Sequence, residues 1–292
     1  MLDQILAFYM TLVTVICSTF GIGGYSRDYK VYKDIKYSDA SPRNVMNIYI
    51  PEAAYEREEN GFILFIHGGS WVQGDKKDKA ADCIQVAAKG YIAATMSYTL
   101  NKTDDYAVDT VLDEIGLAIA RIQSFAAEKG LNVTKGALSG YSAGAHLAML
   151  YSYSRIEESP VELVFTANKV GPSDFSTEAW GDSGPSLARS LAGKKIVEQF
   201  TAEGREDEIV AYVSPVTYVT KDSIPSLFAY GGLDVVVPAG NKTSIINAFK
   251  KAGAPYDFVF YPYNGHGLKM NCITAAPKQY DAKLFAYCEK YF

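Results

Sequence analysis

The chain is poor in the residues that build metal and redox sites. Among its 292 residues are only three histidines and four cysteines. The cysteines form neither a C-x-x-C pair nor a cysteine–histidine cluster with the spacing of a zinc site. The sequence therefore predicts no bound metal and no other cofactor. Internal repeats and low-complexity segments are also lacking, which argues against a solenoid or a fibrous protein.

The cysteines give little indication of disulfide bonds. They are Cys17, Cys83, Cys272 and Cys288. Their even number permits pairing, and Cys272 with Cys288 is the pair to examine first. Because a chain of this length does not need covalent staples to hold its core, reduced thiols are the favoured prediction.

Basic residues are fewer than acidic ones, with 28 lysines and arginines against 33 aspartates and glutamates. The formal net charge is −5 at neutral pH, which argues against nucleic acid as a partner. Two charge runs, Asp75–Lys79 and Glu56–Glu59, are predicted to be solvated loops rather than binding patches. The hydrophobic content of 48% is enough to bury a large core in a single α/β domain.

One long uncharged run stands at the N-terminus. Ile5 to Ser26 carries no charge and is long enough to span a bilayer. Residues 1–4 provide no basic region for a signal peptide, and no clear A-x-A cleavage site follows. The run also contains several hydroxyl residues and three glycines, which weaken its case as a membrane helix. Its apolar residues fit one helical stripe, which comprises Leu2, Ile5, Leu6, Tyr9, Leu12, Val13 and Ile16.

Residues 1–28 are therefore predicted to form an apolar helix that packs as part of a cap, with a membrane anchor as the alternative. Residues 29–292 would form the main domain. The predicted location is the cytoplasm, and anchoring or export through the N-terminal run is the alternative. The sequence is compatible with a homo-oligomer.

The most informative motif is Gly-Tyr-Ser-Ala-Gly at residues 140–144, which has the G-x-S-x-G form of a nucleophile elbow. In such an elbow a serine sits on a sharp turn between a strand and a helix. The local pattern suits this, because Gly136–Tyr141 is typical of a short buried strand and Ala143–Tyr151 of a helix. Glycines at the two ends of the motif avoid steric clashes in a tight turn. Ser142 is therefore the candidate nucleophile.

Partners for this serine follow in the expected chain order. The apolar strand Pro225–Tyr230 leads into Gly-Gly-Leu-Asp, which ends at Asp234, and Phe258–Tyr261 leads into Asn-Gly-His-Gly, which contains His266. Serine, acid and histidine each come just after a predicted strand. His266 is the candidate base and Asp234 the residue that orients it.

Upstream, the apolar strand Phe62–Ile66 ends in His-Gly-Gly-Ser-Trp at residues 67–71, a variant of the HGGG loop. Backbone N–H groups of such a loop bind the negatively charged oxygen of a tetrahedral intermediate. The predicted oxyanion hole comprises the N–H groups of Gly69, Ser70 and Ala143, with Gly68 providing the close turn.

Other residues compete for these roles. His146 is predicted to be a packing residue, since its helix carries it away from the serine hydroxyl. His67 is predicted to brace the glycine loop. Asp174 and Asp182 rival Asp234, although neither follows a strand about thirty residues before the histidine. Two aromatic residues are candidates for substrate binding: Trp71, which fits a pocket wall and the core equally, and Tyr141, for which packing is the simpler role.

Elsewhere strands and helices alternate as in a parallel sheet. Tyr91–Tyr98 and Glu162–Val170 are predicted strands. Predicted helices cover Tyr106–Glu128, Pro238–Ala252 and Pro277–Tyr291. The segment from Asp174 to about Ala211 breaks the alternation and is predicted to be a small cap-like insertion that borders the acyl pocket.

These motifs together resemble those of α/β-hydrolases of the hormone-sensitive-lipase-like esterase group, especially small bacterial carboxylesterases and feruloyl-esterase-like members. The resemblance starts at about Tyr29 and covers most of the chain. It is carried by Lys33–Asp39, Val45–Glu52, His67–Lys76, Gly140–Ala148, Ser214–Val219 and Gly231–Pro238. The loop at residues 67–71 also resembles that of arylformamidases. One departure is Ser70, which replaces the third glycine of the HGGG pattern, keeps its N–H and narrows the pocket there.

The resemblance implies an α/β-hydrolase fold, with a mostly parallel central sheet and helices on both faces. It also implies a serine carboxylesterase that acts on small-molecule esters with short acyl or aromatic groups. An arylformamidase or related amidase is the alternative, because the same residues suit amide chemistry. A catalytically silent binding protein is the third hypothesis, and the intact set of Ser142, Asp234 and His266 argues against it.

Overall fold

A computed structural model of the protein describes residues 28–102, 106–268 and 276–292. Within these residues eight strands form one sheet in the order β1-β2-β4-β3-β5-β6-β7-β8. β1 and β2 pair antiparallel, β2 and β4 pair antiparallel, and every later pairing is parallel. The strands are β1 Tyr29–Lys36, β2 Val45–Pro51, β3 Asn60–Ile66, β4 Ile92–Met96, β5 Val133–Tyr141, β6 Glu162–Lys169, β7 Ser226–Gly231 and β8 Tyr256–Tyr261.

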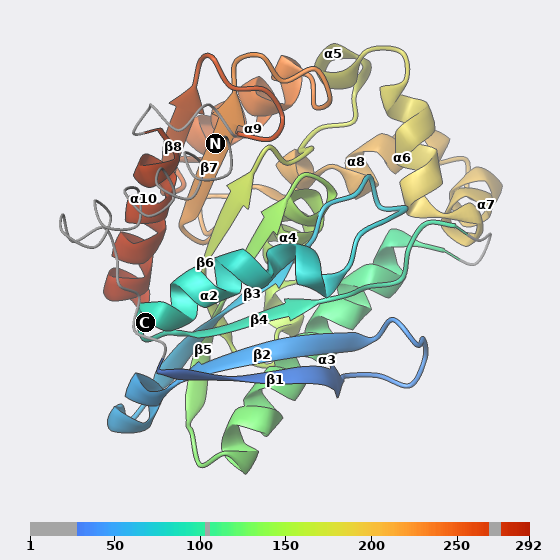
Figure 1. Ribbon diagram of the computed structural model, residues 1–292. Coiled ribbons are helices and arrows are strands. Elements are labelled where there is room, and N and C mark those ends of the chain that lie inside the picture. The colour runs from blue at the N-terminus through green and yellow to red at the C-terminus, as the bar shows by residue number, and fades with distance from the viewer. Residues whose placement is uncertain (1–27, 103–105, 269–275) are drawn as a thin grey trace, which may run out of the picture.

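Helices cover both faces of the sheet (Figure 1). One face packs against α2 (Ala80–Ala88) and α10 (Ala276–Tyr291), whose apolar residues share a core cluster with the strands. The other face packs against α3 (Val108–Glu128), α4 (Ala143–Ser154) and α9 (Ala239–Ala252). Because each parallel strand is buried on both faces, the strands are continuous apolar runs, as in β3. The predicted α/β-hydrolase architecture is confirmed.

Every strand and helix predicted between Phe62 and Tyr291 is present, most with shifted ends. The helix expected from Tyr106 begins at Val108, since the preceding Ala107 has extended backbone (φ −143°, ψ 148°). The strand expected from Gly136 begins three residues earlier, where Val133 pairs with Asn60 of β3.

The segment between β6 and β7 forms the short helices α5 (Thr177–Trp180), α6 (Gly184–Ala192), α7 (Lys194–Ala202) and α8 (Ile209–Val213). They pack over the carboxyl-end side of the sheet next to α3 and α9, at the upper right in Figure 1. The insertion predicted from Asp174 to about Ala211 lies within this segment, and its role as a cap stays a prediction.

Several predictions concern residues outside the described ranges. The N-terminal apolar helix, Cys17 and Cys272 all lie there. Cys83 and Cys288 are buried free thiols. No helix within the described residues is long and apolar enough to cross a membrane.

One sequence-based prediction is wrong. The charge run Asp75–Lys79 is not a fully solvated loop, because Lys76 and Lys79 are only 5% and 9% exposed. Their ammonium groups are satisfied by carboxylates, at 3.0 Å from Asp34 and 3.1 Å from Asp82. A lysine can fold its stem over apolar surface while its charge finds a partner, and no local sequence pattern reveals that partner.

Candidate active site

Ser142 occupies the sharp turn between β5 and α4. Its backbone has φ 55° and ψ −123°, a conformation that residues other than glycine rarely adopt. The turn lifts the serine out of the sheet, and its side chain faces the loops that follow β7 and β8. Such local strain persists only where the surrounding structure enforces it, and strained residues cluster at functional sites.

The two glycines of the motif permit the turn for a steric reason. A Cβ on Gly140 would lie 2.2 Å from the carbonyl oxygen of Gly144, and a Cβ on Gly144 would lie 2.2 Å from the carbonyl oxygen of Ile66. These contacts are with backbone and cannot be relieved by a side-chain rotation. The beginning of α4 therefore packs directly against the end of β3, which brings the serine next to the glycine loop.

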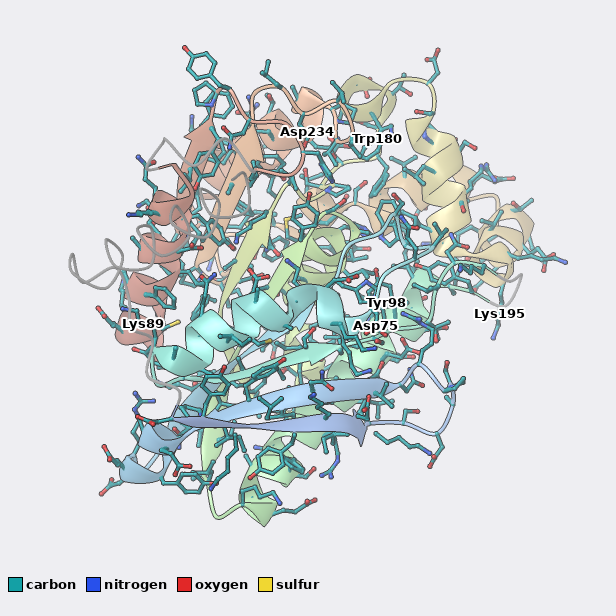
Figure 2. The ribbon with its side chains drawn as sticks, viewed as in Figure 1. Asp75, Lys89, Tyr98, Trp180, Lys195 and Asp234 are labelled. Carbon is teal, nitrogen blue, oxygen red and sulfur yellow. The ribbon has the colours of Figure 1, made fainter. Side chains whose placement is uncertain are left out.

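The structure brings Ser142, His266 and Asp234 into one hydrogen-bonded line. The Nε2 atom of His266 lies 2.9 Å from the Ser142 Oγ, and its Nδ1 atom lies 2.9 Å from the Asp234 Oδ2. The residues come from three loops at the carboxyl edge of the sheet, separated by up to 124 positions in sequence. Asp234 stands at the upper edge of the molecule in Figure 2.

Asp234 is oriented through its second oxygen. The Asp234 Oδ1 accepts hydrogen bonds from the backbone N–H groups of Val236 at 2.9 Å and Val237 at 3.0 Å. Burial alone would raise the pKa of this carboxyl group, but the hydrogen bonds to His266 and to the two N–H groups outweigh it and lower the pKa below its ordinary value. Asp234 is therefore a carboxylate at neutral pH. Its rivals Asp174 and Asp182 are not brought to His266.

The glycine loop after β3 packs against the elbow. A Cβ on Gly68 would lie 2.8 Å from the Tyr141 carbonyl oxygen and 3.2 Å from the Ser142 Cβ. Gly69, Ser70 and Trp71 follow with positive φ angles of 111°, 52° and 62°. The carbonyl oxygen of Gly69 closes the turn by accepting hydrogen bonds from two later N–H groups.

Three N–H groups at this junction remain available for a ligand. No group within the described residues accepts a hydrogen bond from the N–H of Gly69, Ser70 or Ala143. Unpaired N–H groups beside a serine hydroxyl are suited to stabilise an oxyanion. These are the three N–H groups that the sequence predicts for an oxyanion hole, and that role stays a prediction.

His67 braces this loop from below. Its ring stacks on the Tyr98 ring with 4.2 Å between centroids, and its Nδ1 atom lies 2.7 Å from the Gly68 carbonyl oxygen. The ring is fully buried, and burial lowers its pKa. A neutral imidazole donating to the loop matches the bracing role predicted from the sequence.

Trp71 and His146 form a buried pair on the other side of the loop. The Trp71 Nε1 donates to the His146 Nδ1 at 3.1 Å, and the His146 Nε2 donates to the carbonyl oxygen of Val213 at 2.8 Å. Burial lowers the pKa of His146 to about 4, so the ring is neutral and occupied on both nitrogens. His146 is a packing residue, as predicted. Trp71 is 5% exposed, and the structure thus places it in the core rather than on a pocket wall.

Tyr141 joins the elbow to the histidine loop. Its hydroxyl donates to the carbonyl oxygen of His266 at 2.9 Å, and the two rings lie 5.4 Å apart. The ammonium of Lys79 lies 5.0 Å from the centre of the Tyr141 ring. Because Tyr141 precedes the serine directly, one side chain positions the loop that carries the histidine relative to the elbow.

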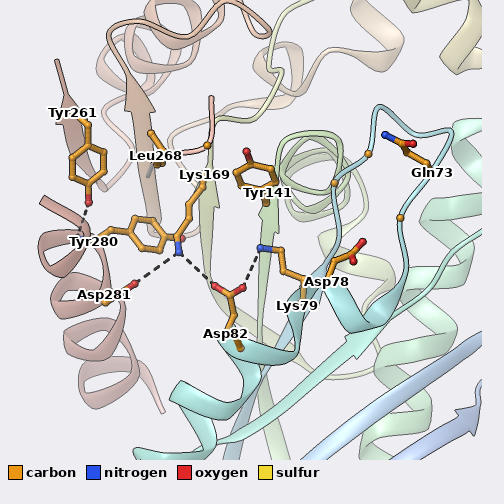
Figure 3. A pocket seen from close by; sticks show the side chains of 15 residues that line it. Gln73, Asp78, Lys79, Asp82, Tyr141, Lys169, Tyr261, Leu268, Tyr280 and Asp281 are labelled. Atoms are coloured by element: carbon orange, nitrogen blue, oxygen red, sulfur yellow. Dashed lines mark hydrogen bonds and ion pairs between the residues drawn. The ribbon is translucent and has the colours of Figure 1, made fainter. Parts of the chain in front are cut away.

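A cavity of about 950 Å³ adjoins this site and is called here the α2–α10 cavity. Figure 3 shows it between the glycine loop, α2 and α10, with Tyr141 on its inner wall. Its far wall carries Lys79, which belongs to the charge run at residues 75–79, and also Asp82, Lys169 and Asp281, which sequence patterns did not single out. None of the residues that line it belongs to the insertion at residues 174–211. Within the described residues no cluster of histidine, cysteine and acidic side chains could hold a metal ion.

The sheet topology and the strained serine after its central strand define the class of the protein as an α/β-hydrolase. The chain belongs to the BD-FAE family, whose model matches residues 46–248. No curated protein matches the sequence.

Solved structures of esterases share the fold. A truncated carbohydrate esterase from gut microbiota has a TM-score of 0.72 at 18% identity, covering 91% of this chain and 97% of its own. Inhibited esterase B from Lactobacillus rhamnosis has a TM-score of 0.70 at 17% identity, covering 99% and 96%. Propionate-bound esterase 2 from Thermogutta terrifontis has a TM-score of 0.70 at 20% identity, covering 92% and 96%.

Proposed function

We propose that this protein is a serine carboxylesterase that hydrolyses short-chain acyl or aromatic esters. The observation that carries the proposal is the continuous line of hydrogen bonds from Asp234 through His266 to Ser142, with 2.9 Å at each step between side chains. A serine hydroxyl is a poor nucleophile unless a base lies within hydrogen-bond reach. Both distances meet that requirement without any rearrangement.

In the proposed mechanism His266 takes the proton of Ser142 as the hydroxyl attacks the ester carbonyl. The Asp234 carboxylate keeps the imidazole in the tautomer with hydrogen on Nδ1 and stabilises the imidazolium that forms. His266 then gives the proton to the departing alcohol. Water repeats the cycle on the acyl-enzyme and releases the acid.

Negative charge on the carbonyl oxygen would be met by the N–H groups of Gly69, Ser70 and Ala143. Their fixed orientation costs no reorganisation during the reaction, because the strained loop and the start of α4 hold them in place. One such donor contributes about 3 kcal/mol to transition-state stabilisation in enzymes of this kind.

The loop at residues 67–71 resembles that of arylformamidases, but its tryptophan gives no support to formamide chemistry. Trp71 is buried, and its N–H is bound to His146, so neither ring edge nor N–H is free for a substrate. Esters therefore remain the proposed substrates, and a formamide serves as the discriminating comparison.

The test is a set of initial rates on p-nitrophenyl esters of increasing acyl length and on an aryl formamide, for the wild type and Ser142→Ala. We expect cleavage of the short esters by the wild type, loss of nearly all turnover in the variant, and little turnover of the formamide. Ser152→Ala is the matched control, because this buried hydroxyl on α4 has no hydrogen-bond partner among the described residues. Preference for the formamide, or turnover independent of Ser142, would overturn the proposal.

A further inference from the structure

The N–H groups of the predicted oxyanion hole belong to two different segments of the chain. Gly69 and Ser70 lie in the loop after β3, whereas Ala143 begins α4. Donors of this kind stabilise an oxyanion only if all of them point at the same position, which requires placement to within about 0.5 Å. A contact that fixes the loop relative to α4 therefore bears directly on their function.

The glycine loop needs outside contacts to keep its shape. Ser70 and Trp71 have positive φ angles of 52° and 62°, which residues other than glycine rarely adopt. Strained backbone of this kind is stable only where neighbouring segments enforce it. Trp71 is the residue of the loop at which such contacts converge, because both its indole N–H and its carbonyl oxygen are hydrogen-bonded to other segments.

His146 joins the loop to α4. Its Nδ1 atom accepts from the Trp71 Nε1 at 3.1 Å, and the two rings meet edge to face with 5.4 Å between centroids. His146 stands on the same helix as Ala143, three residues further along. Both rings are buried, and a buried N–H that loses its acceptor loses the full cost of its desolvation. One hydrogen bond thus holds the loop that carries Ser70 against the helix that carries Ala143.

The helix α8 determines which nitrogen of His146 carries the hydrogen. The Nε2 atom lies 2.8 Å from the carbonyl oxygen of Val213, the last residue of α8. A carbonyl oxygen only accepts, so Nε2 is the donor, and a neutral imidazole then has a lone pair on Nδ1. Burial keeps the ring neutral by lowering its pKa. Val213 therefore selects the tautomer that can accept from Trp71.

A second link ties Trp71 to the segment between β6 and β7. The backbone N–H of Asn101 donates to the Trp71 carbonyl oxygen at 2.9 Å. The side-chain amide of Asn101 donates to the carbonyl and hydroxyl oxygens of Ser190 on α6, at 3.1 and 3.0 Å. Trp71 is thus connected to α8 through its indole and to α6 through its carbonyl group.

We propose that Trp71 and His146 are positioning residues for the oxyanion hole. Their hydrogen bond, called here the Trp71–His146 clamp, keeps the N–H groups of the glycine loop aimed at the same position as that of Ala143. The inference rests on the proposed function, because it gives a role in ester hydrolysis to two side chains whose nitrogens bind neither the serine nor its partners. It also gives α8 a role beyond covering the sheet, since α8 supports the clamp.

The test compares two substitutions of His146 that differ in the acceptor they offer to Trp71. In His146→Asn the amide oxygen takes the place of Nδ1 and accepts from the indole. In His146→Leu the side chain fills similar space and leaves the indole N–H without an acceptor. On p-nitrophenyl acetate we expect kcat to fall about thirtyfold in His146→Leu and about threefold in His146→Asn, with KM within about twofold in both. A fall in kcat alone indicates an interaction made only in the transition state.

A role in packing alone predicts the opposite order. Leucine is the better residue for a buried apolar place, whereas asparagine leaves space and brings a polar amide into the core. Equal rates in the two folded variants, or a slower His146→Asn, would overturn the proposal. Thermal unfolding establishes that each variant is folded.

Trp71→Phe tests the same clamp from the loop side and does not depend on the folding of His146→Leu. It keeps an aromatic ring in the core and removes the N–H donor, so kcat should again fall about thirtyfold. The double variant with His146→Leu should be no slower than either single one, because both remove the same hydrogen bond. Multiplied effects would overturn the clamp.

Trp180→Phe is the matched control. The Trp180 ring stacks on Phe175, and its indole N–H makes no hydrogen bond to any residue that the structure describes. The exchange should therefore leave kcat within about twofold. Turnover that persists in Ser142→Ala would contradict the proposed function. Turnover that depends on Ser142 but falls equally little in Trp71→Phe and Trp180→Phe would overturn the clamp alone.

Discussion

Asp234 uses its two carboxylate oxygens for different partners, and this makes Asp234→Asn a sharp test of the proposed catalytic roles. The Asp234 Oδ1 accepts from two backbone N–H groups, and its Oδ2 faces the His266 Nδ1. An asparagine in this position must place its amide oxygen toward the backbone donors, because an NH₂ group there would meet two hydrogens. Its NH₂ then faces the imidazole.

The consequence for His266 is a change of tautomer. An NH₂ group opposite Nδ1 requires that nitrogen to be an acceptor, so the imidazole proton moves to Nε2. The Nε2 atom lies 2.9 Å from the Ser142 Oγ and would then present a hydrogen instead of a lone pair. The serine loses its base while every heavy atom stays in place. We expect kcat to fall about 10⁴-fold, or roughly 5 kcal/mol of transition-state stabilisation.

The assay is steady-state hydrolysis of p-nitrophenyl acetate at neutral pH, with thermal unfolding as the check on folding. Asp182→Asn is the control, since Asp182 is exposed on the surface and stands far from the histidine in the chain. A folded Asp234→Asn variant that keeps kcat within about tenfold of the wild type would refute the reasoning.

Two further predictions concern stability. Burial lowers the pKa of His146 from 6.5 to about 4, so the unfolded chain binds this proton more readily than the folded protein does. The contribution of His146 to the free energy of unfolding is therefore fully present above pH 6.5 and is lost as the pH falls toward 4. Between pH 6.5 and 5 the protonation of His146 should lower the free energy of unfolding by roughly 2 kcal/mol. Guanidinium unfolding at the two pH values should show a loss smaller by that amount in His146→Gln, and equal losses in both proteins would contradict the assignment. Gly144→Ala should destabilise the protein by about 3 kcal/mol in the same assay, because its Cβ would lie 2.2 Å from the Ile66 carbonyl oxygen. Gly116→Ala is the control, because its Cβ would lie 3.3 Å from its nearest neighbour, and it should change the free energy of unfolding by no more than about 1 kcal/mol. Similar effects of the two substitutions would count against the close approach of α4 to β3.

The sequence by itself determined the order of the main elements and the position of the elbow. Buried parallel strands are continuous apolar runs, and the helix α3 shows an apolar stripe of helical period, so both are visible in short windows of sequence. Gly140 is required by a backbone contact within the turn itself, with the carbonyl oxygen of Gly144, whereas Gly144 is required by the approach of Ile66 in β3. The motif could be recognised without a structure because its five residues are contiguous in the chain. The chain order of serine, acid and histidine then followed from the strands that precede them.

Sequence patterns left the choice among similar residues open, and the packing of distant segments settled it. Asp234 and its rivals have the same side chain; what distinguishes them is a distance of 2.9 Å to a histidine that stands 32 positions away in the chain. His146 lies four residues from the serine, yet its nitrogens are taken by Trp71 and by the carbonyl oxygen of Val213. The sequence allows Trp71 either in a pocket wall or in the core, and its contact with His146 places it in the core.

The ion pairs among Lys79, Asp82, Lys169 and Asp281 show the same limit most clearly. Lys79 stands in a charge run that is typical of a solvated loop. Lys169 at the end of β6 stands 90 positions further along the chain, and Asp281 on α10 stands 202 positions further along. Their charges meet because α2 and α10 pack on the same face of the sheet and the end of β6 carries Lys169 between them. Local patterns determine which segments become strands and helices, since those depend on neighbours in the chain. The partners of a charged side chain depend on how distant segments pack, and that is decided only when the whole core forms.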